Sequence, residues 1–393
     1  MAKQSPSYHF APGDTVSAAG KHSQPYPWEQ RKLGEIGSFR SGVGFPESEQ
    51  GGTAGIPFYK VSDMNLSENN TVMNISSNYV TDDQISRNKW KPIDGNTIIF
   101  AKVGAAVFLE RKRQTRCKFL IDNNMMSYKP NSIQDHDYIY YTFQNLNLSH
   151  YAQIGSLPSL NAGELKNVNI VLPDQNERSK VSQLFLNLDR TITLHEEQHR
   201  QLERLKKALL QKMFADETGY PALRFKGFTE KWEQSYLKDI ASVNSGRDYK
   251  HLNKGNIPVY GTGGYMLSVD KALSNTKDGI GIGRKGTINN PYILKAPFWT
   301  VDTLFYVIPY NVDLNFLYGI FQKIDWRKKD ESTGVPSLSK ENINKTKFKI
   351  PAISEQKEIG TIFQNLDTLI TLHQHKIDNL KRLKRALLQK MFV

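Results

Sequence analysis

The sequence predicts a mixed α/β protein in which two related domains are joined by two long antiparallel helices that pack as a coiled coil. Three observations support this fold class: a long helical segment that occurs twice, short β-rich runs in the two bodies between the repeats, and a heptad-like apolar seam along each helix. Because the helices end related halves, antiparallel packing predicts an internal pseudo-two-fold axis.

The repeated segment FLNLDRTITLHEEQHRQLERLKKALLQKMF begins at Phe185 and aligns without a gap with FQNLDTLITLHQHKIDNLKRLKRALLQKMF, which begins at Phe363. Nineteen of the thirty aligned positions are identical, at a constant offset of 178 residues. The same offset relates two PSL segments, which begin at Pro158 and Pro336. The two halves of the chain are therefore related along their C-terminal parts.

Each half also begins with a common landmark, WEQ, at Trp28 and Trp232, and a shared SG follows at Ser41 and Ser245. The bodies after these landmarks differ in length and sequence, so the two domains are related but not identical. Both contain β-rich runs such as NTIIFAKVGAAVF and PFWTVDTLFYVIP, punctuated by glycine, asparagine and proline. Such runs predict compact mixed α/β domains.

Domain boundaries follow from these landmarks. The segment 1–27 is atypical, because SQPYPWEQ has no counterpart of the LRFKGF that precedes the second WEQ. The predicted parts are a first body at 28–174, a first long helix at 175–215, a linker at 216–231, a second body at 232–352 and a second long helix at 353–393.

The seam residues recur four and three positions apart, with charged residues around them, which is typical of helices that pack on one another. His199, Lys206 and Lys384 share this spacing. The predicted packing seam consists of Leu188, Ile192, His195, Leu202, Leu209, Met213, Leu366, Ile370, His373, Ile377, Leu380, Leu387 and Met391.

The charge balance favours a polyanionic partner or an anionic membrane surface. There are 52 Lys and Arg residues against 39 Asp and Glu residues, a formal net charge of +13, and nucleic acid is the first partner that such a charge suggests. No apolar run has the length of a transmembrane helix, and the N-terminus lacks a signal-peptide core. We therefore expect a soluble intracellular protein without a membrane partner, and the single cysteine, Cys117, agrees with a reducing compartment.

The stretch HEEQH, His195 to His199, matches the H-E-x-x-H pattern of zinc proteases. The aligned stretch of the second repeat is HQHKI, in which Gln374 replaces Glu196 and Ile377 replaces His199. A packing role fits both copies, whereas a zinc site fits only one, so no metal site is predicted.

Two other motifs also lack the context that their chemistry requires. GIGRKG, Gly281 to Gly286, matches a dinucleotide-binding pattern, but prolines and strand-like residues follow where a helix would have to begin. A glycine-rich turn between strands is predicted instead. Asn290-Pro291-Tyr292 lacks the second proline of an adenine methyltransferase motif. No catalytic residues are therefore nominated.

Basic side chains in loops are the candidate DNA contacts. The cluster ERKRQTRCK begins at Glu110, and a second set lies beside tyrosines in the glycine-rich loops of the second body, where the backbone could approach DNA closely. An ordinary solvated loop is the alternative for each. The candidates are Lys60, Lys102, Arg111, Lys112, Arg113, Arg116, Arg247, Tyr260, Arg284 and Lys285.

Taken together, the repeated NLD–ITLH–LKRLKRALLQKMF helices, the GSLPSL and TGVPSL segments and the ALRFKGFTEKWEQ that leads into the second half resemble the specificity (S) subunit of type I restriction-modification systems. The resemblance covers most of the chain from Trp28 onward.

The resemblance implies a non-catalytic, cytoplasmic subunit of a bacterial or archaeal cell that binds double-stranded DNA. Each body would be a target recognition domain that reads one half of a split, asymmetric site. The helices would set the spacing and dock two methyltransferase (M) subunits. S-adenosylmethionine would belong to those subunits, and ATP, Mg²⁺ and cleavage to the restriction (R) side of the complex. A helix from Glu177 to Phe214 would span roughly 57 Å, enough to place two domains in successive major grooves.

Three alternatives remain at this point. A solitary two-domain DNA-binding protein would have the same architecture without enzyme partners, a basic scaffold would bind no defined DNA sequence, and a zinc hydrolase would use HEEQH. Co-purification with an M subunit, sequence-selective retention of DNA and metal analysis distinguish them in turn.

Overall fold

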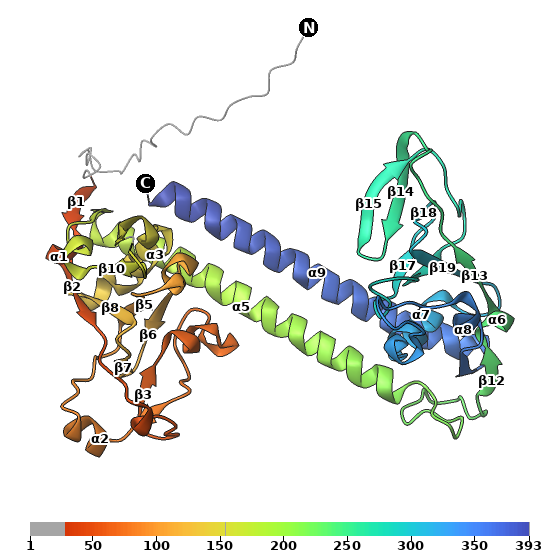
Figure 1. Ribbon diagram of the computed structural model, residues 1–393, viewed down its shortest axis with the longest axis horizontal. Coiled ribbons are helices and arrows are strands. Elements are labelled where there is room, and N and C mark those ends of the chain that lie inside the picture. Colours follow the sequence, from red (N-terminus) through yellow and green to blue (C-terminus); the bar gives the residue numbers. More distant parts are fainter. Residues whose placement is uncertain (1–27, 154, 393) are drawn as a thin grey trace, which may run out of the picture. The chain divides into compact units, whose positions relative to one another are not determined.

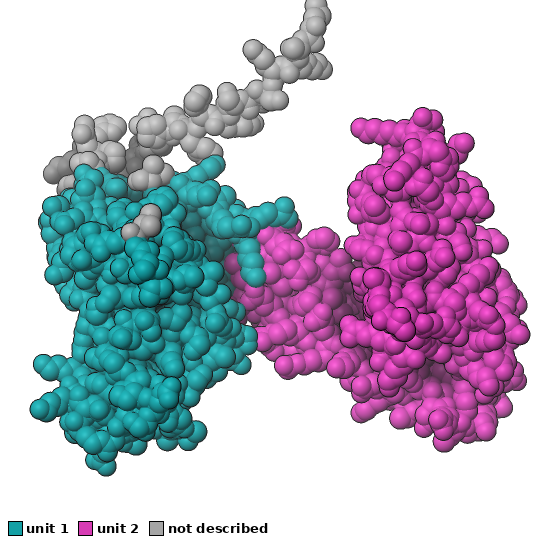
Figure 2. Space-filling view, in the orientation of Figure 1, with its two compact units in different colours: residues 1–190, 381–393 teal, residues 191–380 magenta. Residues whose placement is uncertain are grey.

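The computed structural model describes residues 28–153 and 155–392. The chain divides into two compact units, residues 1–190 with 381–393 and residues 191–380, which Figure 2 shows in different colours. Each unit contains one variable body and a part of each long helix. The predicted N-terminal segment 1–27 lies outside the described residues.

Four antiparallel strands form the larger sheet of the first body (Figure 1). In spatial order they are β2 (Gly37–Ser41), β8 (Met125–Pro130), β5 (Thr97–Ala101) and β6 (Lys112–Thr115). All five residues of β5, TIIFA, are buried. This agrees with a strand that has a neighbour on each side and both faces covered.

Helix α3 (His136–Asn145) supplies aromatic side chains to the core of this body. The rings of Tyr128 and Phe143 have centroids 5.0 Å apart. The buried phenol groups are satisfied, since the hydroxyl of Tyr128 donates to the carbonyl of Leu33 at 2.9 Å and that of Tyr138 donates to the carbonyl of Val171 at 3.0 Å. The two tyrosines thus link the sheet to Leu33 near the start of the body and helix α3 to Val171 near its end.

The remaining elements of the first body are short. A second sheet has the order β4-β3-β7, in which β3 and β7 are parallel, and two strand pairs, β1 with β11 and β9 with β10, complete it. Their bounds are β1 (Glu29–Lys32), β3 (Ile56–Tyr59), β4 (Tyr79–Val80), β7 (Leu120–Ile121), β9 (Ala152–Gln153), β10 (Ser159–Leu160), β11 (Asn169–Leu172), α1 (Leu33–Ile36), α2 (Asp82–Arg87) and α4 (Ala162–Leu165).

Within the described residues, the second body repeats the two larger sheets and the β1–β11 pair of the first body, but no strand pair corresponds to β9 and β10. Its four-stranded sheet has the order β13-β19-β16-β17, its three-stranded sheet has the order β15-β14-β18 with β14 parallel to β18, and β12 pairs with β20. The bounds are β12 (Glu233–Tyr236), β13 (Ala241–Ser245), β14 (Lys254–Gly261), β15 (Gly264–Val269), β16 (Gly279–Gly283), β17 (Tyr292–Leu294), β18 (Trp299–Thr300), β19 (Leu304–Pro309), β20 (Lys347–Ile350), α6 (Leu237–Ile240), α7 (Leu314–Lys323) and α8 (Lys340–Asn344). The prediction of two related mixed α/β domains is confirmed.

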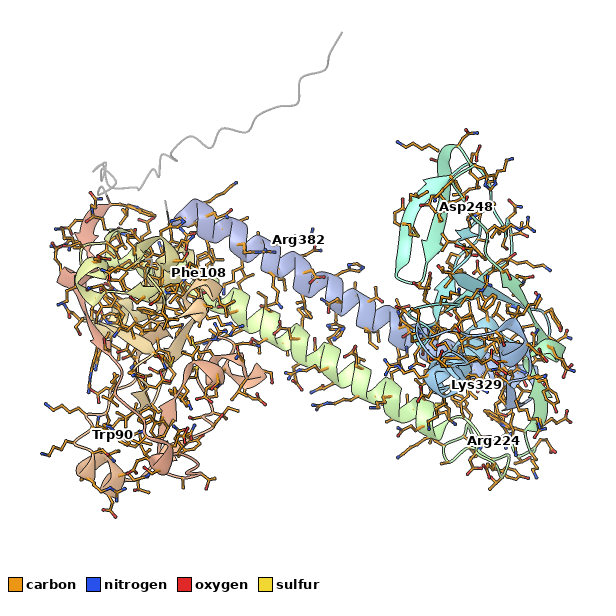
Figure 3. The ribbon with its side chains drawn as sticks, viewed as in Figure 1. Trp90, Phe108, Arg224, Asp248, Lys329 and Arg382 are labelled. Carbon is orange, nitrogen blue, oxygen red and sulfur yellow. The ribbon has the colours of Figure 1, made fainter. Side chains whose placement is uncertain are left out.

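The segment that leads into the second body is held by a buried ion pair. Both terminal oxygens of Glu355, which is 1% exposed, accept hydrogen bonds from the guanidinium of Arg224 at 2.8 Å, and Figure 3 labels this arginine. The bond to Glu355 raises the pKa of Arg224. Nearby, the buried indole of Trp232 packs against Phe316, with ring centroids 5.7 Å apart. The LRFKGF landmark is therefore anchored to the long helix that follows the body, and the WEQ landmark packs on Phe316 of helix α7 within the body.

The two long helices are α5 (Gln175–Lys212), with 38 residues, and α9 (Ile353–Met391), with 39. The predicted helix from Glu177 to Phe214 has the same length as α5 but begins two residues later. The carboxylate of Asp174 accepts the backbone N–H of Glu177 at 2.9 Å and so caps the start of α5. No helix in the described part of the chain is both long and apolar enough to cross a membrane.

Within the second unit, α5 and α9 run antiparallel. His195 contacts His373, Lys206 forms an ion pair with Asp367, and the rings of Phe214 and Phe363 have centroids 5.6 Å apart. The residue number on α9 therefore falls as that on α5 rises. All thirteen predicted seam residues, across the two units, are buried or half-buried.

The first unit repeats these contacts with the two helices exchanged. Asp189 on α5 and Lys384 on α9 form an ion pair at 2.5 Å, and the rings of Phe185 and Phe392 have centroids 5.7 Å apart. Each partner lies 178 residues from its counterpart in the other unit. Such an exchange is what the predicted pseudo-two-fold symmetry requires, and it confirms the predicted fold class.

Candidate nucleic-acid interface

In the second body, one loop gathers four of the predicted DNA-binding residues. This loop, residues 301–303, joins β18 to β19 and is described here with its flanking residues Thr300 and Leu304. Its carbonyl groups accept the backbone N–H of Arg247 at 2.9 Å and of Arg284 at 2.8 Å, and it donates an N–H to the carbonyl of Tyr260 at 3.0 Å. Lys285 follows directly after Arg284. Positions that are far apart in the sequence therefore meet at one end of the strands of the four-stranded sheet.

The side chains of this group present positive charge to the solvent. Arg247, Arg284 and Lys285 are exposed, and Tyr260 is half-buried. The guanidinium of Arg284 lies 5.8 Å from the centre of the Phe305 ring, within the range of a cation–π contact. Cations held in this way can meet phosphate oxygens or base edges without a large conformational change.

The first body has the same set of three backbone hydrogen bonds around the corresponding loop, and we call this set the loop frame. Segment 121–125, which contains the loop between β7 and β8, accepts the backbone N–H of Val43 at 2.9 Å and of Lys102 at 2.7 Å, and it donates to the carbonyl of Tyr59 at 3.0 Å. Lys102 therefore occupies the place of Arg284. Val43 stands where the second body has an arginine, and Tyr59 where it has a tyrosine. The relationship between the two bodies thus extends to their candidate binding edges.

In each body, the residue just before the first donor of the loop frame must be a glycine. A Cβ added at Gly246 would lie 2.0 Å from the carbonyl oxygen of Val301, and one added at Gly42 would lie 1.8 Å from that of Asp122. Both distances are far shorter than any normal contact, so neither position can hold a side chain without moving the loop. This close approach is the physical reason for the shared SG of the two halves.

A second pair of glycines joins the cationic residues to the PSL segments. Gly104 and Gly286 have φ of +81° and +84°, which side chains other than glycine rarely adopt. Their backbone N–H groups donate to the carbonyls of Pro158 and Pro336, both at 2.8 Å. GIGRKG is thus the end of β16 followed by a turn, and the predicted turn between strands is confirmed.

Two residues of the basic cluster of the first body, Lys112 and Arg113, lie on strand β6. Lys112 is 2% exposed, and its ammonium binds the carboxylate of Glu110 and donates to the carbonyl of Leu146 at 2.9 Å. Burial lowers the pKa of Lys112 despite the nearby carboxylate. Burial acts to raise the pKa of Glu110, but the bond from Lys112 and backbone N–H donors outweigh it and lower that pKa. The prediction of Lys112 as a DNA contact is therefore wrong, because its ammonium is buried and paired within the protein.

Its neighbours are also engaged to different extents. The Nε of Arg113 donates to the carbonyl of Asn69 at 2.6 Å, so this guanidinium supports a loop. Burial lowers its pKa. Arg111 is half-buried and bonds to the side chain of Asn65. Arg116 is exposed and pairs with Asp137 at 3.3 Å. The sequence cluster is therefore no continuous cationic surface.

The two remaining lysines of the first body lie close to the loop frame. Lys60 follows Tyr59 and donates from Nζ to Oε1 of Gln50 at 3.1 Å, while Lys102 donates to the hydroxyl of Ser41 at 3.3 Å. Both are half-buried. They are therefore better placed as candidate contacts than the residues of β6.

Two residues of the second body that the sequence did not nominate belong with this group. A hollow in the surface is lined by Arg284, Lys285, Lys340 and the carboxylate residue Glu331, among others. Glu331 and Lys340 stand on either side of the second PSL segment, where the repeated offset could have drawn attention to them. Three cations and one carboxylate thus surround one opening.

The histidines of HEEQH have different surroundings. Nδ1 of His195 lies 3.0 Å from Nδ1 of His373, whereas Nδ1 of His199 lies 3.8 Å from the carboxylate of Glu203. Within residues 28–153 and 155–392, no three His, Cys, Asp or Glu side chains are grouped so that they could hold a metal ion.

Comparison with known proteins gives the family of this sequence. The family described as "Type I restriction modification DNA specificity domain" matches twice, at residues 25–204 and 229–382, and so covers both halves. The type I restriction enzyme MjaVIII specificity subunit of Methanocaldococcus jannaschii is 20% identical over 302 residues, which are 66% of this chain and 69% of that protein.

Solved structures agree in fold. The type I restriction-modification S subunit of M. genitalium superposes with a TM-score of 0.70 at 16% identity, over 95% of this chain and 98% of that one. A chain from a structural study of complex assembly and conformational transition in the type I system gives a TM-score of 0.51 at 14% identity, over 94% of this chain and 98% of that one.

Proposed function

Because this chain belongs to the type I restriction-modification DNA specificity family, we propose that it is the sequence-reading subunit of such a complex and has no catalytic activity of its own. Its two bodies, taken as residues 28–174 and 232–352, each read one half of a split, asymmetric DNA site. The observation that carries this proposal is the loop frame that recurs in both bodies, with Lys102 and Arg284 at equivalent places.

The difference between the bodies supports an asymmetric site. One position of the loop frame is cationic in both bodies, as Lys102 or Arg284. At two other positions the bodies differ, since Val43 of the first body stands in the place of Arg247 and Val103 in the place of Lys285. A shared frame with different side chains would place DNA similarly while reading different bases, because phosphate contacts fix position and base contacts give specificity.

The long helices, within the predicted segments 175–215 and 353–393, would act as spacer and docking surface for two M subunits. Leu194 and Leu205 on α5 are 57% and 47% exposed, and their repeat counterparts Leu372 and Leu383 on α9 are 59% and 48% exposed. Exposed leucines at equivalent positions of two helices suit two copies of one partner, since apolar side chains contribute most when a partner covers them.

The chemistry of the complex would then belong to the other subunits. S-adenosylmethionine would be bound by the M subunits, and ATP and Mg²⁺ would be used with the R subunits. A flipped adenine would enter an M subunit while this chain holds the flanking bases. The complex would work on double-stranded DNA in the cytoplasm.

Co-production of the full chain with its M subunits tests this proposal. The complex should retain one split sequence from a random duplex library, whereas the M subunits without this chain should retain none. Equal retention of all duplexes by the complex would show a scaffold without sequence recognition. Selective binding by the chain without any stable M complex would identify a solitary DNA-binding protein.

A further inference from the structure

Next to each PSL segment, an amide and a carboxylate side chain are hydrogen-bonded to each other. In the first body, Nε2 of Gln153 donates to Oε1 of Glu164 at 2.8 Å. In the second body, Nδ2 of Asn342 donates to Oε1 of Glu331. The offset of 178 residues relates Gln153 to Glu331 and Glu164 to Asn342. The two bodies thus have the same pair at the same positions, with amide and carboxylate exchanged.

The positions are equivalent in structure as well as in sequence. Gln153 pairs with Ser159 in the short β9–β10 ladder, and the backbone N–H of Glu331 donates to the carbonyl of Ser337 at 3.2 Å. The other partner stands in each case on the short helix that follows PSL, α4 or α8. Each pair therefore links the chain before PSL to the helix after it.

The pairs lie beside the cationic residues of the loop frame. Ser159 forms a β-bridge with Val103, which follows Lys102, and Ser337 forms the corresponding bridge with Lys285. In the second body, Glu331 lines the same hollow as Arg284, Lys285 and Lys340. A polyanion that is drawn to those cations would therefore pass close to the pair.

A carboxylate at such a place is not suited to a phosphate, because two negative charges repel each other. It is suited to a hydrogen-bond donor on the same polyanion. The exposed donors of duplex DNA are the amino groups of the bases, and a carboxylate accepts from the N4 amino group of cytosine, while an amide pairs with adenine through N6 and N7. Gln153, Glu164 and Glu331 are exposed and Asn342 is half-buried, so most of these groups can be reached.

We propose that the Gln153–Glu164 and Glu331–Asn342 pairs read base edges, each in the half-site of its own body. The exchange of amide and carboxylate is then one reason why the two half-sites differ in sequence. This inference rests on the proposed function, since it assigns specificity-determining residues to the two recognition domains.

The exchanged pair also provides the test. Glu331→Gln combined with Asn342→Glu gives the second body the arrangement of the first. One hydrogen bond, one amide and one negative charge are retained, so the exchange should leave the selected DNA sequence unchanged if the pair is only structural. If the pair reads bases, the selected sequence should change, because donor and acceptor groups have changed places.

The experiment uses the full chain in complex with its M subunits and a duplex library with randomised positions. The exchange should alter the preferred base at one position of the second half-site by about ten- to a hundredfold. The first half-site and the gap should stay unchanged. The matched control, Gln153→Glu with Glu164→Gln, should alter only the first half-site.

If both exchanged complexes select the wild-type sequence and melt at the wild-type temperature, the pairs are structural and the inference is overturned. Should the exchange in the second body prevent folding, the exchange in the first body and the single isosteric change Glu331→Gln decide the matter in the same way. A wild-type complex that selects no sequence at all would instead contradict the proposed function.

Discussion

His195 on α5 and His373 on α9 face each other with their Nδ1 atoms 3.0 Å apart, and the two residues are the same position of the internal repeat. The pair is therefore a contact between the two copies of the repeated helix within the second unit. On one side of this pair Lys206 binds Asp367, and in the other unit Lys384 binds Asp189. The HEEQH stretch is therefore understood through helix packing, in which its counterpart HQHKI takes an equal part.

Acid should weaken the packing at the histidine pair. Burial, together with Lys376 and His373, lowers the pKa of His195 below its ordinary value of 6.5, and a bond with Gln198 only partly opposes this. The unfolded chain then takes up a proton at higher pH than the folded chain does, so stability falls as the pH falls below about 6.5 and stops falling below the folded pKa. Thermal melting between pH 7.5 and 5.5 should show a smaller loss for His195→Gln than for the wild type. Superimposable profiles would contradict the contact as a source of pH dependence.

Replacing Lys112 should reduce stability, whereas replacing Arg284 should reduce DNA binding, although the sequence nominated both as DNA contacts. Lys112→Met leaves Glu110 without its cationic partner and should lower the free energy of unfolding by about 3 kcal/mol, while the salt dependence of DNA binding in the surviving folded fraction stays unchanged. Arg284→Gln should leave the melting temperature nearly constant. It should either weaken binding to all sequences and reduce the salt slope by about one, or relax one base of the site. Equal effects of the two changes would refute this division of roles.

The close approach at Gly246 predicts a local defect. Gly246→Ala places a methyl group against the carbonyl of Val301 and should cost about 1–3 kcal/mol of stability. It should also weaken selection of the second half-site more than the first, because the displaced loop holds Arg247 and Arg284. Gly263→Ala is the matched control, since nothing lies within 4 Å of its added Cβ. Wild-type melting and wild-type selection by Gly246→Ala would show that the loop adjusts freely.

The helices should determine the gap between the half-sites. Inserting four residues near Glu197 lengthens α5 by about 6 Å, close to two base-pair rises of about 3.4 Å, and rotates the following face by only about 40°. Both half-sites should keep their base sequences while the gap grows by one or two base pairs. Selection of duplexes from a random library measures this directly. Altered letters with an unchanged gap would mean that the helices do not set the spacing.

The helices were the part of the fold that the sequence predicted best, because their periodicity is local and each copy checks the other. Leu188, Ile192 and Met213 could be placed on one seam without knowing any partner. The body elements were predicted in less detail, but the prolines and strand-like residues after GIGRKG correctly indicated a turn where a nucleotide site would need a helix.

The candidate DNA-binding surfaces depend on contacts that no local pattern encodes. Lys112 lies in a run of basic residues, yet its burial follows from Glu110 and from Leu146, which is distant in the sequence. Likewise, Arg247 and Arg284 meet only because both bond to the loop before β19. The repeat could have revealed Glu331 through its counterpart Gln153, but their importance is visible only after the loop frame has placed them beside cations.

Mapping methylated adenines in DNA that has been exposed to the complex of this chain with its M subunits tests the central claim most directly. We expect N6-methyladenine within one split site whose two halves differ in sequence and are separated by a fixed nonspecific gap, and no methylation by the purified chain alone. Robust methylation by the chain alone, or methylation by the complex without a common split sequence, would contradict the account.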